Sequence, residues 1–190
     1  MVEFFKSLIP GLWLAWLAFW VLAARGTKET VRQETAGSRF MHHAPLVAGA
    51  VLLGWPHVLG PAFEQRFHAH TFGWFLTGFA LVIVGLGFAV AARVYLGGNW
   101  SGTVTLKKGH ELVQSGPYAL VRHPIYTGLL VALIGTAVAV DRWRAVAGLT
   151  LLITGIAYKI SVEERFMREQ FGDAYARYRA RVKALVPFVV

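Results

Sequence analysis

Hydrophobic residues in this chain gather into long runs that are interrupted by short polar segments. Five such runs cover residues 7–24, 44–60, 71–92, 125–140 and 145–158. The third run contains no charged residue and, as a helix, is long enough to cross a hydrocarbon core of about 30 Å. The last two runs are short and are separated only by residues 141–144 (DRWR), which favours a tight helical hairpin with its charges at the turn. The pattern predicts an all-α, polytopic integral membrane protein with about five transmembrane helices.

The composition supports this class. Hydrophobic residues make up 56% of the chain and charged residues 15%, whereas a soluble domain carries about 25% charged residues. So apolar a sequence also excludes intrinsic disorder. The absence of cysteine from the sequence excludes a disulfide framework, a thiolate nucleophile and a cysteine-ligated zinc site.

The basic residues predict an orientation in the membrane. The formal net charge is +9, and in so apolar a chain this charge favours anionic lipid headgroups over nucleic acid, for which no motif is present. If the N-terminus lies outside, 15 of the 19 Lys and Arg residues fall in cytoplasmic segments. Such an excess is typical of the cytoplasmic side. The loop over 93–124 and the C-terminal tail are therefore expected to face the cytoplasm, from a cell inner membrane or the endoplasmic reticulum.

The first candidate site lies at the start of the fourth run, where Arg122, His123 and Pro124 follow a long polar loop. Proline suits the first position of a helix because it has no N–H group to leave unpaired. His123 is then at or beside the N-cap, where free amides and the helix dipole favour an anion such as a carboxylate. A structural interpretation, with a capping His-Pro pair and an arginine extending to the interface, stays open.

The second candidate site lies at the end of the fifth run and contains Lys159, Glu163 and Glu164. Lys159 and Glu163 are four residues apart and can share a helical face. Adjacent carboxylates at a membrane boundary often have partners or functional roles, although a solvated helix end would look the same. The tail beyond is amphipathic, with Gly172 placed to end one helix and Asp173 to cap another, which predicts amphipathic tail helices at the interface.

Two pairs of histidines could suggest a metal site. They are His42 with His43 and His68 with His70. In the predicted topology they fall in loops, without a carboxylate at ligand spacing, so we expect solvated histidines and no metal.

Taken in order, GHELV, SGPY, RHPIYTG and EERFMREQFGDAYARY resemble the isoprenylcysteine carboxyl methyltransferase and phospholipid methyltransferase superfamily. The resemblance covers residues 98–190, and the earlier part of the chain resembles it only in being a set of membrane spans. It implies a single integral-membrane methyltransferase domain over 1–190, with variable spans over 1–97 and the cofactor-binding and catalytic core over 98–190. The implied cofactor is S-adenosyl-L-methionine, and the implied product is S-adenosyl-L-homocysteine.

The resemblance also implies roles for particular residues. The cofactor-binding positions are His110, Glu111, Leu112, Val113, Tyr118, His123, Pro124, Ile125, Tyr126 and Glu163, with Thr105 at a position where the family usually has a longer polar residue. The family's arginine for the substrate carboxylate corresponds to Lys159, which keeps the charge but loses the bidentate geometry. Lys159 and Arg122 are expected to face the acceptor head, and Glu164 is the nearest proton acceptor for an amine or thiol.

The implied reaction is methyl transfer to a lipid-like or isoprenoid acceptor, either a prenylcysteine carboxylate or a phospholipid headgroup. The partners expected are the bilayer and a lipophilic or lipid-modified acceptor, with no nucleic acid and no metal. Two alternatives remain at this stage. One is an NADPH-dependent membrane reductase of the sterol type, and the other is a non-catalytic membrane scaffold.

Overall fold

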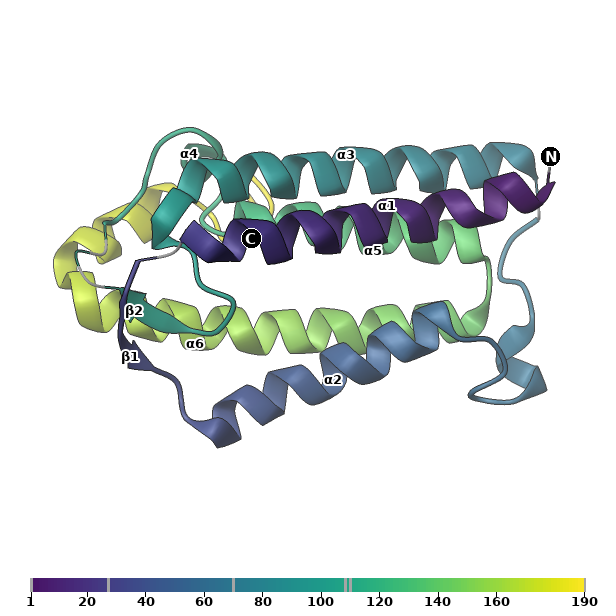
Figure 1. The fold of residues 1–190 in the computed structure, drawn as a ribbon, viewed down its shortest axis with the longest axis horizontal. Coiled ribbons are helices and arrows are strands. Elements are labelled where there is room, and N and C mark those ends of the chain that lie inside the picture. Colours follow the sequence, from purple (N-terminus) through teal and green to yellow (C-terminus); the bar gives the residue numbers. More distant parts are fainter. Residues whose placement is uncertain (1, 27, 70, 108, 110, 190) are drawn as a thin grey trace.

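The computed structural model describes residues 2–26, 28–69, 71–107, 109 and 111–189. Long helices run side by side along its longest axis, and a short pair of strands lies at one end (Figure 1). The elements are α1 (Val2–Ala23), η1 (Ala24–Gly26), β1 (Thr30–Gln33), α2 (Ala36–Gly54), η2 (Pro61–Glu64), α3 (Phe72–Leu96), η3 (Gly97–Asn99), β2 (Thr105–Lys107), α4 (Pro117–Leu120), α5 (Pro124–Val140) and α6 (Trp143–Arg181).

The long helices form two close pairs that are held together by glycines. In the pair of α3 and α5, a Cβ added at Gly85 would stand 2.5 Å from the carbonyl oxygen of Gly128. In the pair of α2 and α6, a Cβ added at Gly49 would stand 2.7 Å from the carbonyl oxygen of Gly148. Small residues let helix backbones approach this closely where lipid gives no hydrophobic driving force between helices.

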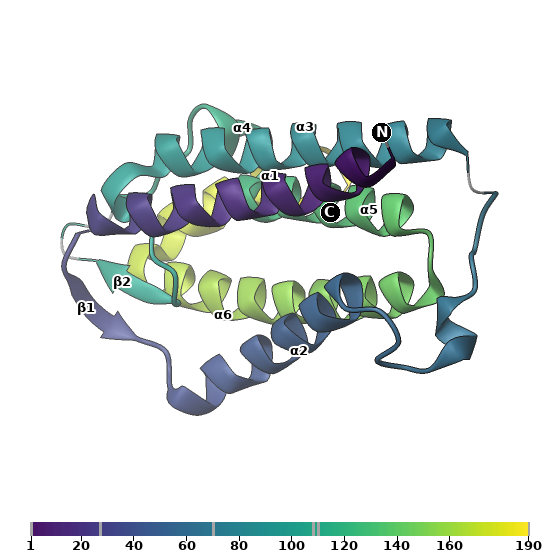
Figure 2. The same cartoon turned by 45° about the vertical axis from the view of Figure 1, so that its right-hand side comes forward.

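The predicted tight hairpin of the last two hydrophobic runs is only partly correct. Asp141, in the left-handed conformation with φ of 53°, ends α5, and α6 begins two residues later. The two helices then separate, because α5 packs mainly against α3 and α6 mainly against α2. The separation between these two layers is visible in both ribbon views (Figures 1 and 2), and a cavity lies there.

The all-α expectation misses a short antiparallel sheet. β1 pairs with β2 so that Thr30 faces Lys107 and Gln33 faces Thr105. Strands of four and three residues are too short to give a recognisable alternating pattern. The pairing joins the first part of the chain to the loop that follows α3.

The second helix begins eight residues before its hydrophobic run. Thr35 caps α2 by accepting a hydrogen bond from the Ser38 amide. His42 therefore lies inside the helix, fully buried and 3.1 Å from Oε1 of Glu34, so the expectation of a solvated loop histidine is wrong there. His43 is exposed, and His70 lies outside the described residues. Within the described ranges, no group of three His, Asp or Glu residues could hold a metal ion.

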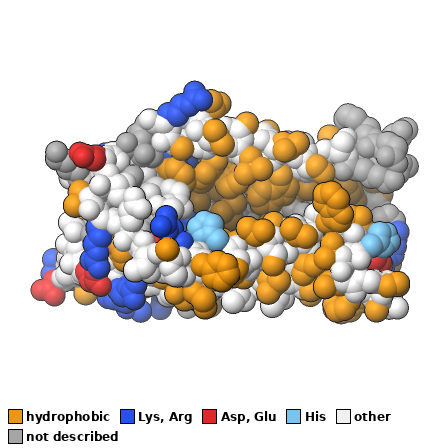
Figure 3. Space-filling view, turned by 60° about the horizontal axis from the view of Figure 1, so that its bottom comes forward, with side chains coloured by type: hydrophobic (Ala, Val, Ile, Leu, Met, Phe, Trp, Pro, Cys, Tyr) orange, Lys and Arg blue, Asp and Glu red, His pale blue; other side chains and the backbone are white. Residues whose placement is uncertain are grey.

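Two helical segments, Phe72–Asn99 and Trp143–Arg181, are long and apolar enough to cross a membrane, and Ser7–Ala23 and Pro124–Val140 are shorter apolar helices. Many large hydrophobic side chains point outward, among them Leu14, Val21 and Val84, each 65% exposed. The space-filling view shows hydrophobic side chains around a hollow in one face, with basic residues gathered at one end (Figure 3). Such exposed apolar surface is typical of contact with lipid.

α6 is kinked at Gly172, whose φ is 47°, where the sequence predicts a break.

Candidate cofactor and acceptor site

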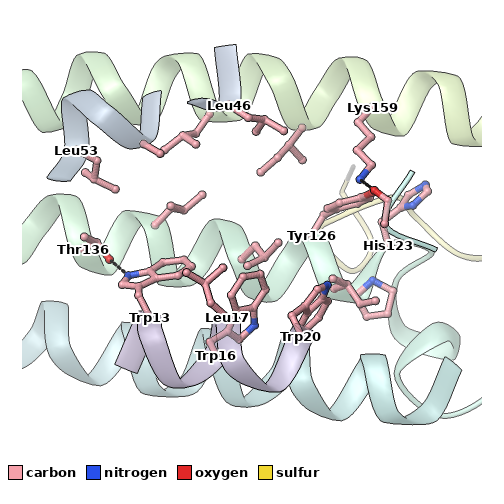
Figure 4. Close-up of a pocket in the computed structure, with 18 of the residues that line it drawn as sticks. Trp13, Trp16, Leu17, Trp20, Leu46, Leu53, His123, Tyr126, Thr136 and Lys159 are labelled. Atoms are coloured by element: carbon pink, nitrogen blue, oxygen red, sulfur yellow. Dashed lines mark hydrogen bonds between the residues drawn. The ribbon is translucent and has the colours of Figure 1, made fainter. Parts of the chain in front are cut away.

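A cavity of about 1,700 Å³ lies between the two helix pairs. Its apolar wall includes Trp13, Trp16 and Trp20 of α1 and Leu46 and Leu53 of α2 (Figure 4). A pocket for one drug-sized ligand has a volume of roughly 300–1,000 Å³. The cavity is therefore large enough for two ligands side by side.

The polar end of the cavity is built where α5 begins. His123 occupies the N-cap position of this helix, without a side-chain hydrogen bond to it, and Pro124 lies in its first turn, as the sequence predicts. The Tyr126 hydroxyl donates a hydrogen bond to Oε1 of Glu163, and Oε2 of Glu163 lies 3.7 Å from Nδ1 of His123. A carboxylate thus lies beside a helix N-terminus, and the two can bind a cation and an anion, respectively. Together they fit the ammonium and carboxylate of an amino acid.

Tyr118 lies against this end of the cavity from α4. Its carbonyl oxygen accepts a hydrogen bond of 2.6 Å from the Tyr178 hydroxyl, which fixes α4 against the end of α6. Burial raises the pKa of the Tyr118 hydroxyl, and the nearby Glu163 carboxylate raises it further. The hydroxyl therefore stays protonated at neutral pH and can donate a hydrogen bond to an anion.

The loop beyond α3 completes this end of the cavity with Glu111, Leu112 and Val113. Lys28 joins two parts of this loop. Its ammonium donates hydrogen bonds to Oδ1 of Asn99 and to the carbonyl of Gly109, both at 2.9 Å. It also lies 3.3 Å from the Glu111 carboxylate. Sequence reasoning missed Lys28, which lies 71 positions before Asn99 without a motif around it. His110, one of the predicted cofactor residues, lies outside the described residues.

Lys159 reaches into the cavity from α6 (Figure 4). Its ammonium donates a hydrogen bond of 2.9 Å to the carbonyl of Gly102 and lies 5.8 Å from the centre of the Tyr126 ring. It is a cation at the boundary between the polar end and the apolar chamber. An acceptor with an anionic head could bind there.

Glu164 does not line the cavity, although its neighbour Glu163 does. Its buried carboxylate accepts hydrogen bonds from the Arg122 guanidinium, and Nε2 of His123 lies 3.3 Å from the same oxygen. Arg179 approaches the other oxygen at 3.4 Å. A carboxylate that pairs with several guanidinium groups is a poor proton acceptor, so the predicted role of Glu164 as a base does not fit the geometry.

Arg122 lines the cavity, but its guanidinium is engaged elsewhere. Besides Glu164, it donates to the backbone carbonyls of Arg179 and Val182 at the end of α6. Its guanidinium therefore holds the end of α6, and a contact of Arg122 with an acceptor head stays a prediction.

The residues that follow α6, 183–185, are hydrogen-bonded to the start of α5. The amides of Arg122 and His123 donate to the carbonyls of Lys183 and Ala184, at 2.8 and 3.0 Å, and the Thr127 hydroxyl donates to the carbonyl of Leu185 at 2.8 Å. Nothing in the sequence pattern indicates this pairing, because backbone hydrogen bonds of an irregular segment carry no residue signature.

The predicted cofactor residues that the structure describes all line this one cavity, together with Lys159 and Arg122. They come from the loop beyond α3, from α4, from the start of α5 and from α6. The sequence motifs, separated by up to about fifty positions, are thus brought together in space.

Comparisons with known proteins find relatives of similar sequence. Protein-S-isoprenylcysteine O-methyltransferase B of Arabidopsis thaliana is 31% identical over 121 residues, which are 61% of this chain and 61% of that protein. Protein-S-isoprenylcysteine O-methyltransferase A of the same plant is 32% identical over 137 residues, which are 70% of this chain and 66% of that protein. The chain spans about three fifths of the length of the first of these relatives.

A solved structure shares the fold. It is that of a eukaryotic intramembrane Ras methyltransferase, isoprenylcysteine carboxyl methyltransferase, with a TM-score of 0.58 and 24% sequence identity. The alignment covers 82% of this chain and 55% of that one. The family described as "Phospholipid methyltransferase" matches residues 74–174, which contain the loop, α4, α5 and α6 as far as Ala174. On this match, which confirms the resemblance of the sequence motifs, the chain belongs to the phospholipid methyltransferase family.

Proposed function

We propose that this protein is an integral membrane methyltransferase that uses S-adenosyl-L-methionine to methylate a lipid-like or isoprenoid acceptor. The observation that carries the proposal is the single cavity, which joins a polar end suited to an amino acid zwitterion to a long apolar chamber. Methyl transfer requires that the nucleophile and the methyl group be aligned and kept from water. A chamber walled by tryptophans and aliphatic side chains meets the second requirement.

The residues present fit the cofactor. Glu163 would bind its ammonium group, and Tyr118, His123 and the amides at the start of α5 would bind its carboxylate. Leu112, Val113 and Ile125 offer an apolar surface for the adenosine. The hydroxyl of Thr105 supports this fit, because it is buried, lies on a residue that lines the cavity and has no hydrogen-bond partner among the described residues. The cofactor supplies an electrophilic methyl group bound to a sulfonium.

Lys159 would receive the acceptor head. Its ammonium is held by a neutral carbonyl rather than by a carboxylate, so its charge remains free to attract an anion such as a prenylcysteine carboxylate or a phosphate of a phospholipid. An ionised carboxylate needs no base to become a nucleophile, which agrees with the engagement of Glu164 in ion pairs. In this proposal Arg122 and Glu164 are positioning residues. The acceptor tail would lie between α1, α2, α5 and α6.

In the proposed topology five helices cross the membrane and the site faces the cytoplasm. Most of the Lys and Arg side chains visible in Figure 3 lie toward one end of the molecule, which supports such an asymmetric orientation. The membrane would be a cell inner membrane or the endoplasmic reticulum.

The proposal is tested with the purified full chain in detergent. Calorimetry should detect binding of S-adenosyl-L-homocysteine and no binding of NADPH. Incubation with labelled S-adenosyl-L-methionine and total membrane lipid, followed by mass analysis, should yield a methylated lipid. Binding of NADPH instead would identify a reductase, and binding of neither compound would favour a scaffold.

A further inference from the structure

Glu34 is a buried carboxylate outside the residues that the family match covers. It lies between β1 and α2, and its side chain is 0% exposed. Its oxygens accept hydrogen bonds of 3.1 Å from the Val104 amide and 2.7 Å from the Ser38 hydroxyl, and Nε2 of His42 lies 3.1 Å away. The amide of Glu34 in turn donates to the carbonyl of Val104 at 3.0 Å. Glu34 and Val104 are therefore joined twice.

Three converging donors explain why a carboxylate occupies this position. A carboxylate can accept all three hydrogen bonds, whereas an amide or hydroxyl brings a donor of its own. Because the carboxylate only accepts, Nε2 of His42 carries the proton that points to it. Nδ1 of His42 is buried without a partner among the described residues, which fits a neutral ring. Hydrogen bonds outweigh the effect of burial and lower the pKa of Glu34, so the carboxylate is ionised at neutral pH.

The segment that Glu34 holds is a wall of the site. Residues 102–105 all line the cavity. Val104 packs with Val162 and Phe166 of α6, and two residues before it the carbonyl of Gly102 accepts the hydrogen bond from Lys159. A continuous set of contacts thus leads from Glu34 through residues 102–104 to the ammonium in the cavity.

We infer that Glu34 is a positioning residue for Lys159: it fixes the carbonyl of Gly102, and through that carbonyl it places the ammonium at the acceptor end of the cavity. The inference rests on the proposed function in so far as Lys159 faces the acceptor. It assigns a task in the site to a residue in the N-terminal part of the chain, which matches no motif.

The first test needs no activity. The full chain in detergent is treated with an amine-acylating reagent, and the labelling rate of Lys159 is followed by mass spectrometry, with exposed Lys183 as the internal reference. Glu34→Ala should raise the labelling rate of Lys159 about threefold or more, because the segment whose carbonyl accepts the hydrogen bond of its ammonium loses its anchor. Glu34→Gln keeps an acceptor for the Val104 amide and should stay near the native rate. Ser38→Ala removes a different donor to the same carboxylate and serves as the matched control.

The second test is a double-mutant cycle on the single-turnover methylation rate. If Glu34 acts through Lys159, Glu34→Ala should slow transfer about tenfold in the native background and less than about twofold in the Lys159→Met background. A merely structural role would slow both backgrounds equally. Glu34→Gln should restore most of the rate.

The outcomes separate the two proposals. Unchanged labelling of Lys159 in Glu34→Ala, or equal losses in the two backgrounds, would overturn the positioning role even if the native protein binds S-adenosyl-L-homocysteine. Failure of the native protein to bind S-adenosyl-L-homocysteine would overturn the proposed function, whereas the labelling result would still decide whether Glu34 places Lys159.

Discussion

Glu163 and Lys159 are one helical turn apart on α6 and reach the same cavity, but their partners differ. Glu163 is held by the Tyr126 hydroxyl and lies near His123 at the start of α5, whereas Lys159 is held by the carbonyl of Gly102. No described contact joins the two charges directly. These different partners agree with the separate tasks proposed for the two residues, Glu163 toward the cofactor and Lys159 toward the acceptor.

This division of tasks gives a paired prediction. Glu163→Gln should weaken binding of S-adenosyl-L-homocysteine about ten- to a hundredfold, since a hydrogen bond to a charged group contributes about 1.5–3 kcal/mol. Lys159→Met should leave this affinity within about threefold but slow transfer to an anionic acceptor. The measurements are calorimetric affinity and single-turnover rate for both variants. Equal loss of cofactor affinity in both would show that the two residues act as one ion pair.

Glu34 gives a prediction about pH. Its pKa in the folded protein lies below the ordinary value of 4.5, because hydrogen bonds from Ser38, Val104 and His42 outweigh its burial. A lowered pKa stabilises the fold at pH values above 4.5, and this contribution is lost as the pH falls from 4.5 through the folded-state value. Glu34→Gln should therefore be less stable than the native protein at neutral pH, and the difference should shrink in acid. Thermal unfolding of both proteins between pH 7 and pH 3 measures it, and a difference that grows in acid would contradict the assignment.

Most of the site could be predicted at the residue scale because the chemistry is concentrated in short motifs. His123 followed by Pro124 predicts the start of a helix. Glu163 lies one turn from Lys159 on a helix that the fifth hydrophobic run predicts. Lys28, Glu34 and Tyr178 could not be predicted, since each acts through a backbone carbonyl or amide far away in the sequence. Arg122 and Glu164 each belong to one of the two polar clusters that the sequence shows, but the ion pair between them depends on how the helices and the tail fold.

At the scale of elements, glycines decide which helices pair. Gly85 and Gly87 lie two positions apart on α3 but face different surroundings: a Cβ at Gly85 would meet the backbone of α5 at 2.5 Å, and a Cβ at Gly87 would meet nothing within 4 Å. The sequence shows both glycines in the same run and cannot tell them apart. Which of the two glycines is packed depends on which side of α3 is turned toward α5.

This difference supplies a matched pair of variants. Gly85→Ala should separate α3 from α5 and lower the unfolding midpoint in detergent by several degrees, because an overpacked contact costs about 1–3 kcal/mol. Gly87→Ala should leave the midpoint unchanged or slightly raised, since alanine favours a helix interior. The midpoints of the two variants are compared with that of the native protein. A larger loss in Gly87→Ala would show that the close crossing is elsewhere.

At the same scale, the hairpin expectation is correct for the short turn and wrong for the packing of the two helices. A short turn between two consecutive runs predicts close packing of α5 against α6, because consecutive elements are usually neighbours. Here Gly128 and Gly135 of α5 face α3, and Gly148 of α6 faces α2. The two helices that the turn joins thus present their small residues away from each other and leave the cavity between them.

For the whole molecule, the absence of cysteine from the sequence allows a direct test of orientation. Single cysteines are introduced at the exposed positions Ala62, Ser115 and Asp173, one at a time. A membrane-impermeant thiol reagent applied to intact cells should label Ala62→Cys, and it should reach Ser115→Cys and Asp173→Cys only after permeabilisation. Labelling of Ser115→Cys and Asp173→Cys from opposite sides of the membrane would contradict the five-span topology.

The pairing of α2 with α6 also determines when the protein can be assembled. Gly49 and Gly148 touch across this pair, and about 5–20 seconds of synthesis separate them at roughly 5–20 residues per second. During that time α2 is present in the nascent chain before its partner α6. In the same way, α3 is made before its partner α5. The wall of the chamber opposite α5 is therefore among the last parts to form. If synthesis stops before α6, Gly49 of α2 has no helix to pack against. The chamber therefore cannot exist before Lys159 and Glu163 of α6 have themselves been made.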